Sequence, residues 1–374
     1  MRPSVRLGAF YFAFFAYVGL MVAYLPAYLA ARGLGAAEIA WVLALPQVVR
    51  IFAPTAGGWA ADRTGARRAF VALGCAANAL CFALMPLAGG TAAIAALVAG
   101  GALLSAAALP LVEAITLGVL AGQPGRYGPI RVWGSLGFIV AVLVGGAWLE
   151  RHAAATVAPA LSLAGAASLA AALALPSAQV PRAPSGRVLA LPRGAAMLLA
   201  CGFCMALAHG TLYAFLTLHL ERVGYGPSLI GLLWTLGVLA EILVFLALPA
   251  IFLRAGLPAI LMVSCLMGAA RFLIIGWAAE FGWLVVLAQL MHAATFGAFH
   301  AASVAAIHRL FPATSHGRGQ ALYSSLANGA GGAAGTLAAG WAWEMAGPGV
   351  AFSVAALAAL TGVLLAYPLK RAGL

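Results

Sequence analysis

Apolar stretches long enough to cross a lipid bilayer follow one another along nearly the whole chain. A transmembrane helix needs about 20 mainly apolar residues, and twelve stretches approach or exceed that length. Only 7% of the 374 residues are charged and 65% are hydrophobic, which excludes a soluble globular domain. The sequence therefore predicts an all-α membrane protein. The predicted spans are 7–30, 38–61, 69–88, 91–121, 131–149, 157–176, 194–220, 228–252, 258–278, 282–308, 320–343 and 349–369.

The basic residues predict how these spans are oriented. With the N-terminus inside, fifteen of the 20 Lys and Arg residues fall in inner loops and tails, three in outer loops and two within spans. Positive residues favour the cytoplasmic side, so we expect a multi-pass protein of the inner (cytoplasmic) membrane with both termini in the cytoplasm. The net charge of +12 then reflects topology, and it does not indicate nucleic-acid binding, which needs a basic water-exposed domain.

Two halves of six spans each are predicted on either side of a Pro- and Arg-rich segment. The predicted domains are an N-terminal bundle over 1–176, a cytoplasmic linker over 177–193 and a C-terminal bundle over 194–374. Weak internal matches indicate a duplication: Gly33 aligns with Gly224, and Trp133 aligns with Tyr323 in a nearby register. The predicted fold is two pseudo-symmetric six-helix bundles.

Glu113 and Arg131 are the polar residues that stand out in the first half. Each lies in or beside a predicted span, where a charged side chain is costly unless it faces a partner or a wet cavity. The turn at 123–125 would let two antiparallel helices bring the two charges together. Phe138 follows Arg131 by seven residues and shares its helix face. We expect this group to bind a small molecule; the alternative is an ion pair that only joins two helices.

Further intramembrane polar and aromatic residues are candidates for the same site. Two arginines within the spans and a third at the start of one, Arg131, are opposed by only two carboxylates, so a cavity lined by them is neutral to positive and suits an anion. Histidines that protonate near neutral pH add to this charge. Helix packing or an interfacial belt is the alternative explanation for the aromatic residues. The expected substrate-binding residues besides Glu113, Arg131 and Phe138 are Tyr24, His209, Tyr213, Trp234 and Arg50.

The loop between the second and third spans carries a recognisable motif. The stretch 58–68 reads GWAADRTGARR and resembles the GxxxDRxGRR loop of the major facilitator superfamily. We expect Gly58 to let helices approach closely and Asp62 to cap or pair at a helix end. The expected role of the motif is conformational. Its residues are Gly58, Asp62, Arg63, Gly65, Arg67 and Arg68.

Stretches 127–135, 209–213, 233–241 and 291–296 resemble the phenylpropionate permease family, which is related to lactose permease. The resemblance implies that Glu113 and Arg131 form the substrate-binding acid–base pair. It also implies that Glu241, Arg271 and His292 act in proton coupling. Phe138 falls where lactose permease has a tryptophan that stacks on the sugar. Thr295 falls where it has the proton-releasing carboxylate, so we assign the proton to Glu241, relayed by His292.

These observations predict a secondary active transporter. We expect proton-coupled uptake of a small organic anion, such as a phenylpropanoid-like carboxylate, by alternating access. The alternatives are a sugar or nucleoside proton symporter and, less favoured because the fifth span lacks a Gly-Pro pair, a drug exporter. An enzyme is not expected, because the histidines are scattered singly. The expected partners are the solute, protons and the lipid bilayer, with no metal, no cofactor and a monomeric state.

Overall fold

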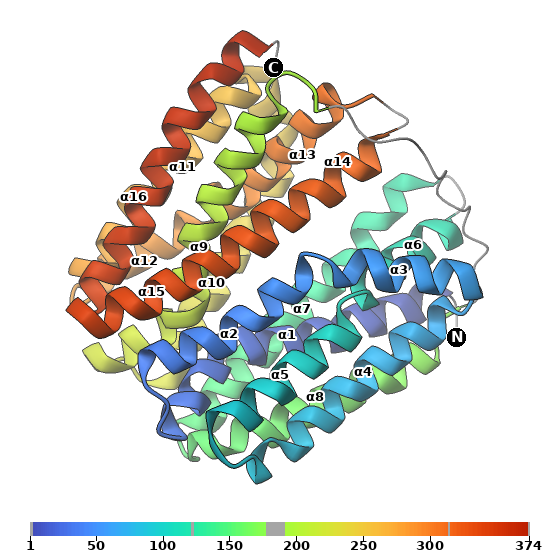
Figure 1. Ribbon diagram of the computed structural model, residues 1–374, viewed down its shortest axis with the longest axis vertical. Coiled ribbons are helices and arrows are strands. Elements are labelled where there is room, and N and C mark those ends of the chain that lie inside the picture. The colour runs from blue at the N-terminus through green and yellow to red at the C-terminus, as the bar shows by residue number, and fades with distance from the viewer. Residues whose placement is uncertain (1–2, 121–122, 177–190, 313–314, 373–374) are drawn as a thin grey trace. The chain divides into compact units, whose positions relative to one another are not determined.

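The computed structural model describes residues 3–120, 123–176, 191–312 and 315–372, and every regular element among these residues is helical (Figure 1). The helices before residue 177 are α1 (Pro3–Ala31), α2 (Ala36–Arg50), α3 (Ala53–Thr64), α4 (Arg67–Leu84), α5 (Gly90–Ser105), α6 (Ala108–Leu120), α7 (Tyr127–Leu149) and α8 (Val157–Leu173). Those after residue 190 are α9 (Ala195–Val223), α10 (Pro227–Arg254), α11 (Leu257–Trp277), α12 (Gly282–Leu290), α13 (Phe299–Leu310), α14 (His316–Tyr323), α15 (Gly332–Ala346) and α16 (Pro348–Ala366). Two π-helical segments are η4 (Ala293–Ala298) and η6 (Ser324–Gly331). Short 3₁₀ segments are η1 (Met85–Leu87), η2 (Pro124–Arg126), η3 (Ala154–Thr156) and η7 (Tyr367–Ala372).

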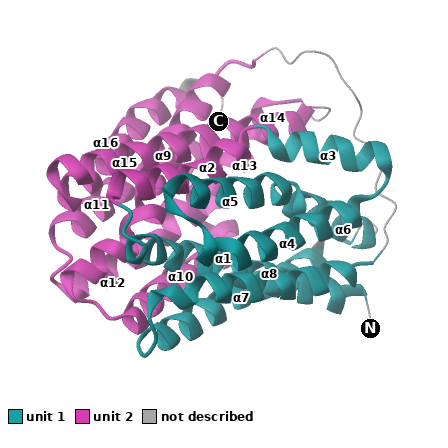
Figure 2. Ribbon diagram, turned by 60° about the horizontal axis from the view of Figure 1, so that its bottom comes forward, with its two compact units in different colours: residues 1–34, 52–186 teal, residues 35–51, 187–374 magenta. Residues whose placement is uncertain are grey.

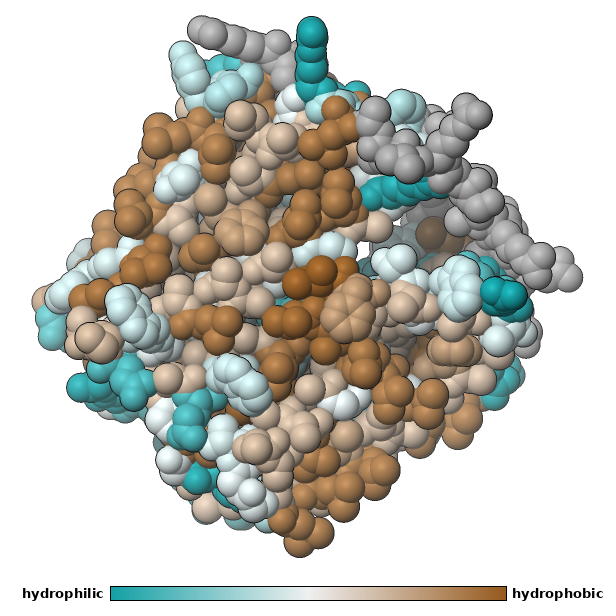
Figure 3. Space-filling model, viewed as in Figure 1, coloured by the Kyte–Doolittle hydropathy of each residue, from teal (hydrophilic) through white to brown (hydrophobic). Residues whose placement is uncertain are grey.

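Long apolar helices dominate the structure. Ten of the described helical runs are long and apolar enough to cross a membrane, and an eleventh is counted when α2 and α3, bent by 43°, form one span. The predicted span 320–343 falls on the helical run α14–η6–α15, which is rich in Gly, Ser and Ala. Leu246 and Leu253 are 76% and 88% exposed, and Figure 3 shows hydrophobic side chains over much of the visible face. The predicted all-α membrane architecture is confirmed.

The chain divides into two compact units (Figure 2). Unit 1 comprises residues 1–34 and 52–186, and unit 2 comprises 35–51 and 187–374. The predicted halves therefore differ from the units in one respect: α2 belongs with the second unit. The reason is close packing of α2 on α15, where a Cβ on Gly340 would collide with that of Ala40. Most of the predicted linker, 177–190, lies outside the described residues.

Left-handed glycines end the first long helix of each predicted half. Gly33 follows α1 with φ +84°, and Gly224 follows α9 with φ +105°. Only glycine adopts this conformation without a steric penalty, so it is suited to terminate a helix. These are the two glycines that the internal repeat aligns.

Helix crossings of the same kind occur inside each unit. In unit 1, α1 packs on α7, and a Cβ on Gly8 would lie 3.0 Å from the Trp133 ring. In unit 2, α9 packs on η6 and α15, and a Cβ on Gly202 would lie 2.6 Å from the Tyr323 ring. Trp133 and Tyr323 are the residues that the repeat pairs. Their shared environment, an aromatic ring lying on a glycine, supports the duplication.

Direct backbone contact occurs further along both crossings. A Cβ on Gly137 of α7 would collide with the Phe12 carbonyl of α1. A Cβ on Gly335 of α15 would collide with the Leu207 carbonyl of α9. Small residues allow helices to approach closely in membranes, where packing rather than the hydrophobic effect holds them together. The glycine-rich run 329–335, which ends at Gly335, therefore lies at a close helix crossing.

The break between α2 and α3 is stabilised within unit 2. The Ser325 hydroxyl donates a hydrogen bond to the Ile51 carbonyl at 2.7 Å. At the other end of α2, the Ala37 amide donates to the Glu344 carboxylate at 3.2 Å. A break inside a membrane span leaves backbone groups without helical partners, and side chains from neighbouring helices can satisfy them. The π-helical segment η6, which carries Ser325, therefore satisfies a backbone carbonyl at the end of α2.

Candidate functional site

Arg271 is the most deeply buried cation among the described residues of unit 2. Its side chain on α11 is 1% exposed and donates to Gln289 Oε1 at 2.9 Å and to Thr295 Oγ1 at 3.1 Å. Both partners are neutral, and Nε has no hydrogen-bond partner. Among the described residues no carboxylate oxygen lies within 4.0 Å of the guanidinium. A buried charge normally requires a counter-charge, so this arrangement favours a nearby anion.

Glu241 and His292 face each other beside Arg271. His292 Nε2 lies 3.9 Å from Glu241 Oε2, and the side chains are 9% and 18% exposed. His292 directly precedes the π-helical segment η4, and its ring stacks on Phe296 with centroids 5.2 Å apart. Widened turns of this type frequently mark functional positions in helices. The contact brings a carboxylate and an imidazole close enough to exchange a proton through one small shift or one water.

His209 extends this group of rings on α9. Its Nδ1 lies 2.9 Å from the Met205 carbonyl, so Nδ1 carries the proton, and the buried Nε2 has no partner. The ring centroid lies 6.0 Å from that of His292 and 5.9 Å from that of Tyr213. The unpartnered nitrogen is therefore available to accept a hydrogen bond.

Tyr213 and Trp234 form an aromatic pair in the same unit. Their rings are stacked with centroids 6.3 Å apart, and Trp234 Nε1 donates to Thr217 at 3.2 Å. Tyr213 lies within electrostatic range of Glu241, Arg271 and Arg50. Arg50, exposed at the end of α2, belongs to unit 2. Unit 2 thus collects seven of the predicted site residues, which are His209, Tyr213, Trp234, Arg50, Glu241, Arg271 and His292.

Arg131 forms a second polar group in unit 1. Its guanidinium carbon lies 4.1 Å from the centre of the Phe15 ring and 5.5 Å from that of Tyr11. These distances suit a cation–π contact. Glu113 on α6 is within electrostatic range of Arg131 and interacts with the Tyr127 hydroxyl, but no ion pair within 4.0 Å joins the described Glu113 and Arg131. The acid and base are therefore neighbours without direct contact.

Phe138 and Tyr24 make contacts other than those expected of substrate-binding residues. The aromatic ring on Arg131 is Phe15 of α1, because the α1–α7 crossing places α1 over this face. Phe138 is half-buried where α7 approaches Gly19 of α1. Tyr24 is 1% exposed, and its hydroxyl donates to the Val142 carbonyl at 2.7 Å. This contact gives Tyr24 a role in helix packing, which was the alternative considered for the aromatic residues.

The motif at 58–68 has a clear local structure. Arg67 binds Asp62, with Nη2 at 2.6 Å and Nε at 2.8 Å from Oδ1. Gly65 caps α3 with φ +70°. A Cβ on Gly58 would meet nothing within 4 Å, so the expected close approach at Gly58 is wrong. The neighbouring Gly57 faces Ala107, which a Cβ would approach to 2.7 Å.

Arg63 and Arg68 complete this motif on the unit 1 surface. Both side chains are exposed, and the Arg63 guanidinium lies 5.3 Å from the Trp59 ring centre. Neither approaches the Arg131 group in the contacts of the described residues. The motif is thus a surface element of unit 1.

Gln289 is the principal site residue that the sequence interpretation missed. It is 1% exposed and holds Arg271. The sequence does contain a signal for Gln289, because it is a polar residue in an apolar span. It also precedes His292 and Phe296 by three and seven residues, which places all three on one helix face. Phe15 and Tyr11 carry no such signal, since aromatic residues are common throughout α1. No cluster of three or more potential metal ligands is found among the described residues.

Comparison with known proteins decides the family. Residues 4–354 match the MFS_1 like family. The chain belongs to this family. It is 30% identical over 268 residues to the probable 3-phenylpropionic acid transporter of Escherichia coli (strain K12), with 69% of each protein covered. It is 29% identical over 363 residues to the maltose permease of Geobacillus stearothermophilus, with 95% of this chain and 91% of the permease covered.

Solved structures agree on the fold. The nucleoside transporter NupG matches with a TM-score of 0.82 and 19% identity over 99% of both chains. The peptide transporter POT in complex with sulfate matches with a TM-score of 0.82 and 15% identity, covering 100% of this chain and 95% of that one. The MFS_1 like chain therefore has the major facilitator fold and is a multi-pass secondary transporter of a small molecule, not an enzyme. Its resemblance to the phenylpropionate permease family is confirmed.

Proposed function

We propose that this transporter takes up a small organic anion, such as an aromatic carboxylate, together with protons and by alternating access. The observation that carries the proposal is the state of Arg131. Its guanidinium is half-buried against Phe15 and has no carboxylate within 4.0 Å among the described residues. A planar guanidinium binds a carboxylate through two parallel hydrogen bonds. The aromatic rings beside it suit a substrate that has an apolar body, as the name of the E. coli relative indicates for that protein.

Proton coupling is proposed for the polar group of unit 2. Glu241 is the carboxylate of this group, and His292 lies 3.9 Å from it. Protonation of Glu241 would neutralise it, so that the buried charge of Arg271, which has only neutral partners, would be balanced by the substrate anion. Deprotonation would restore a carboxylate near Arg271 and His292. The proton and the substrate anion would thus compensate each other's charge within the membrane, where an uncompensated charge is costly.

Sugar or nucleoside symport is the second candidate. It is favoured by the stacked Tyr213–Trp234 pair, because flat aromatic faces bind sugar rings and bases. Two of the similar proteins, the maltose permease and the nucleoside transporter NupG, are named for a sugar and a nucleoside. Export remains less favoured, on the sequence argument from the fifth span.

One uptake experiment separates these candidates. Purified protein in liposomes would be given an inward proton gradient and, in separate assays, radiolabelled 3-phenylpropionate, maltose or uridine, with unlabelled 3-phenylpropionamide as a competitor of the acid. We expect the acid to accumulate and the amide to compete poorly. Accumulation of maltose or uridine without accumulation of the acid would overturn the proposal in favour of the second candidate.

Orientation, membrane and oligomeric state are part of the same proposal. We place both termini in the cytoplasm and the protein in the inner membrane, because of the bias of basic residues toward one set of loops. We also propose that the transporter is a monomer. Reporter fusions at Arg126 and Glu150, on opposite ends of α7, test the orientation. An exported reporter at Arg126 would reverse it.

A further inference from the structure

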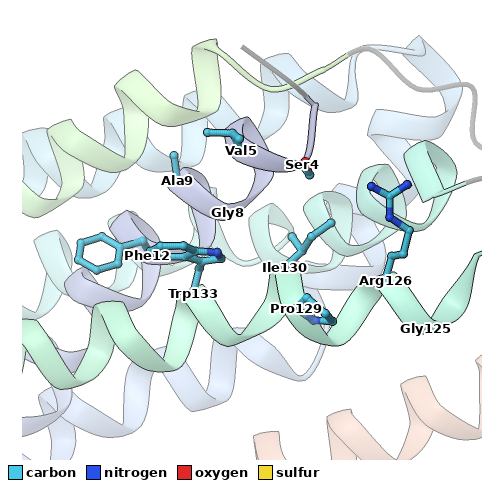
Figure 4. Close-up of a pocket in the computed structure, with 10 residues that line it drawn as sticks. All are labelled: Ser4, Val5, Gly8, Ala9, Phe12, Gly125, Arg126, Pro129, Ile130 and Trp133. Atoms are coloured by element: carbon cyan, nitrogen blue, oxygen red, sulfur yellow. The ribbon is translucent and has the colours of Figure 1, made fainter.

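A groove of about 680 Å³ lies within unit 1, between the first turns of α1 and the start of α7 (Figure 4). Both helices begin at this end, so the groove opens at one end of the bundle rather than at its middle. None of the residues assigned to substrate or proton binding lines it. The lining residues are Ser4, Val5, Gly8, Ala9, Phe12, Gly125, Arg126, Pro129, Ile130 and Trp133.

Gly8 and Trp133 shape this groove. The absence of a side chain at Gly8 lets the Trp133 ring lie on the backbone of α1, where a Cβ would come within 3.0 Å. Trp133 is still 49% exposed, so one part of the ring packs on α1 and the rest faces outward. Val5 and Ala9 are also exposed along the same edge of α1. The groove thus has an exposed apolar wall, which in a soluble protein would be buried.

The polar residues of the groove gather at one end. Figure 4 shows Ser4 and Arg126 at the end where the two helices begin, whereas Phe12 and Trp133 lie further along them. Arg126 is exposed, is the N-cap residue of α7 and donates to Gln123 Oε1 at 3.2 Å, which leaves other guanidinium protons available. The N-terminal end of α7 carries positive partial charge beside it.

We propose that this groove binds an anionic phospholipid, with the phosphate at Arg126 and one acyl chain along Val5, Ala9 and Trp133. The match is one of charge and polarity: a cation at one end and apolar walls beyond it. Residues 4–12 span roughly 12 Å of helix, which accommodates about nine methylene groups of an extended chain. Basic pockets between transmembrane helices bind anionic lipid headgroups in this manner, and tryptophan is favoured near the membrane interface. With the proposed orientation, the lipid would come from the cytoplasmic leaflet.

Lipid retention measured by native mass spectrometry tests the proposal. The full-length protein would be extracted from nanodiscs that contain equal amounts of phosphatidylglycerol and phosphatidylcholine. We expect one tightly retained phosphatidylglycerol and no comparable phosphatidylcholine. Arg126→Gln should weaken retention by about tenfold or more, because the charge-assisted hydrogen bonds to phosphate are lost. Ala9→Phe should weaken it similarly by filling the groove.

Two matched variants serve as controls. Arg151→Gln removes another exposed arginine of unit 1, and Ala83→Phe adds a phenyl group to an exposed alanine of α4; both should retain the lipid. Retention of phosphatidylglycerol at the wild-type level in both Arg126→Gln and Ala9→Phe would overturn the proposal. A loss in Arg126→Gln alone, together with competition by inorganic phosphate, would also overturn it, because the site would then bind a free anion. If 3-phenylpropionate occupied the groove instead of lipid, the groove would be assigned to the substrate and the lipid proposal would be excluded.

Discussion

Arg271 Nη2 donates to Gln289 Oε1 at 2.9 Å, so a neutral amide holds the buried guanidinium of unit 2. A carboxylate at this position would neutralise the arginine permanently. The amide instead fixes its orientation and preserves its charge. Two substitutions at residue 289 can therefore separate the orientation of Arg271 from its charge.

Gln289→Leu should lower stability and Gln289→Glu should impair transport for different reasons. The leucine variant leaves a buried charged donor unsatisfied and should cost about 1.5–3 kcal/mol, seen as a lower melting temperature. The glutamate variant forms an ion pair with Arg271 and should fold normally, but it should transport the anion poorly. Gln123→Leu, at an exposed site, is the control for stability. Normal transport by the glutamate variant would show that transport does not require the uncompensated charge of Arg271.

Arg131→Lys should weaken binding of an aromatic acid by about 1.5–3 kcal/mol, or roughly ten- to a hundredfold, because lysine cannot form the two parallel hydrogen bonds. The corresponding amide should bind weakly to both proteins and be little changed. Calorimetric titration with 3-phenylpropionate and its amide measures both effects. Arg151→Lys, in an exposed position, should bind like wild type. Equal wild-type affinity for acid and amide would exclude an anion-selective site.

Glu241→Gln should abolish uphill uptake and leave exchange of labelled for unlabelled substrate intact. Glutamine keeps the shape of the side chain but cannot carry a proton, and exchange requires no net proton movement. Proteoliposomes with and without a pH gradient separate the two activities. Glu221→Gln, which removes an exposed carboxylate near the end of α9, should retain both. If Glu241→Gln still accumulated substrate against its gradient, another group would have to carry the proton.

Gly137→Ala and Gly335→Ala should each destabilise the protein by about 1–3 kcal/mol, the usual cost of overpacking. In both cases the new Cβ would collide with a backbone carbonyl, which cannot move aside as a side chain can. Gly100→Ala in α5, where a Cβ meets nothing within 4 Å, should be neutral or stabilising. Thermal melts in one detergent compare the three. A gain in stability in all three variants would show that helix propensity, not contact, sets the effect.

Span length and rare intramembrane charges predicted the fold and most of the unit 2 group. These signals work because crossing a bilayer imposes a minimum helix length, and because a charge within it requires a function or a partner. Glu241, Arg271 and His292 are rare residues in apolar helices, and they lie close together. Tertiary packing brings the three residues together, but they could be identified as site residues without knowing how the helices pack.

Contacts between helices far apart in the sequence were not predictable in the same way. Phe15 covers Arg131 because α1 crosses α7 at Gly137, and nothing in the α7 sequence identifies that ring. Gly57, not Gly58, makes the close contact of the motif loop, since one residue rotates a helix face by roughly 100°. Placement of α2 with unit 2 likewise depends on its fit to α15. Sequence periodicity constrains which residues share a face, but not which face meets which helix.

The π-helical segment η4 gives the span 282–310 a second available arrangement. A widened turn accommodates an additional residue, and its conversion to α-helix would rotate α13 by roughly 100° relative to α12. Thr295, which holds Arg271, lies inside the segment, so this rotation would break one of the two hydrogen bonds of the guanidinium. Backbone amides at 293–298 should therefore exchange with deuterium faster than those of α9, and bound substrate should slow them. Equal protection of both segments, with and without substrate, would show that the widened turn is static.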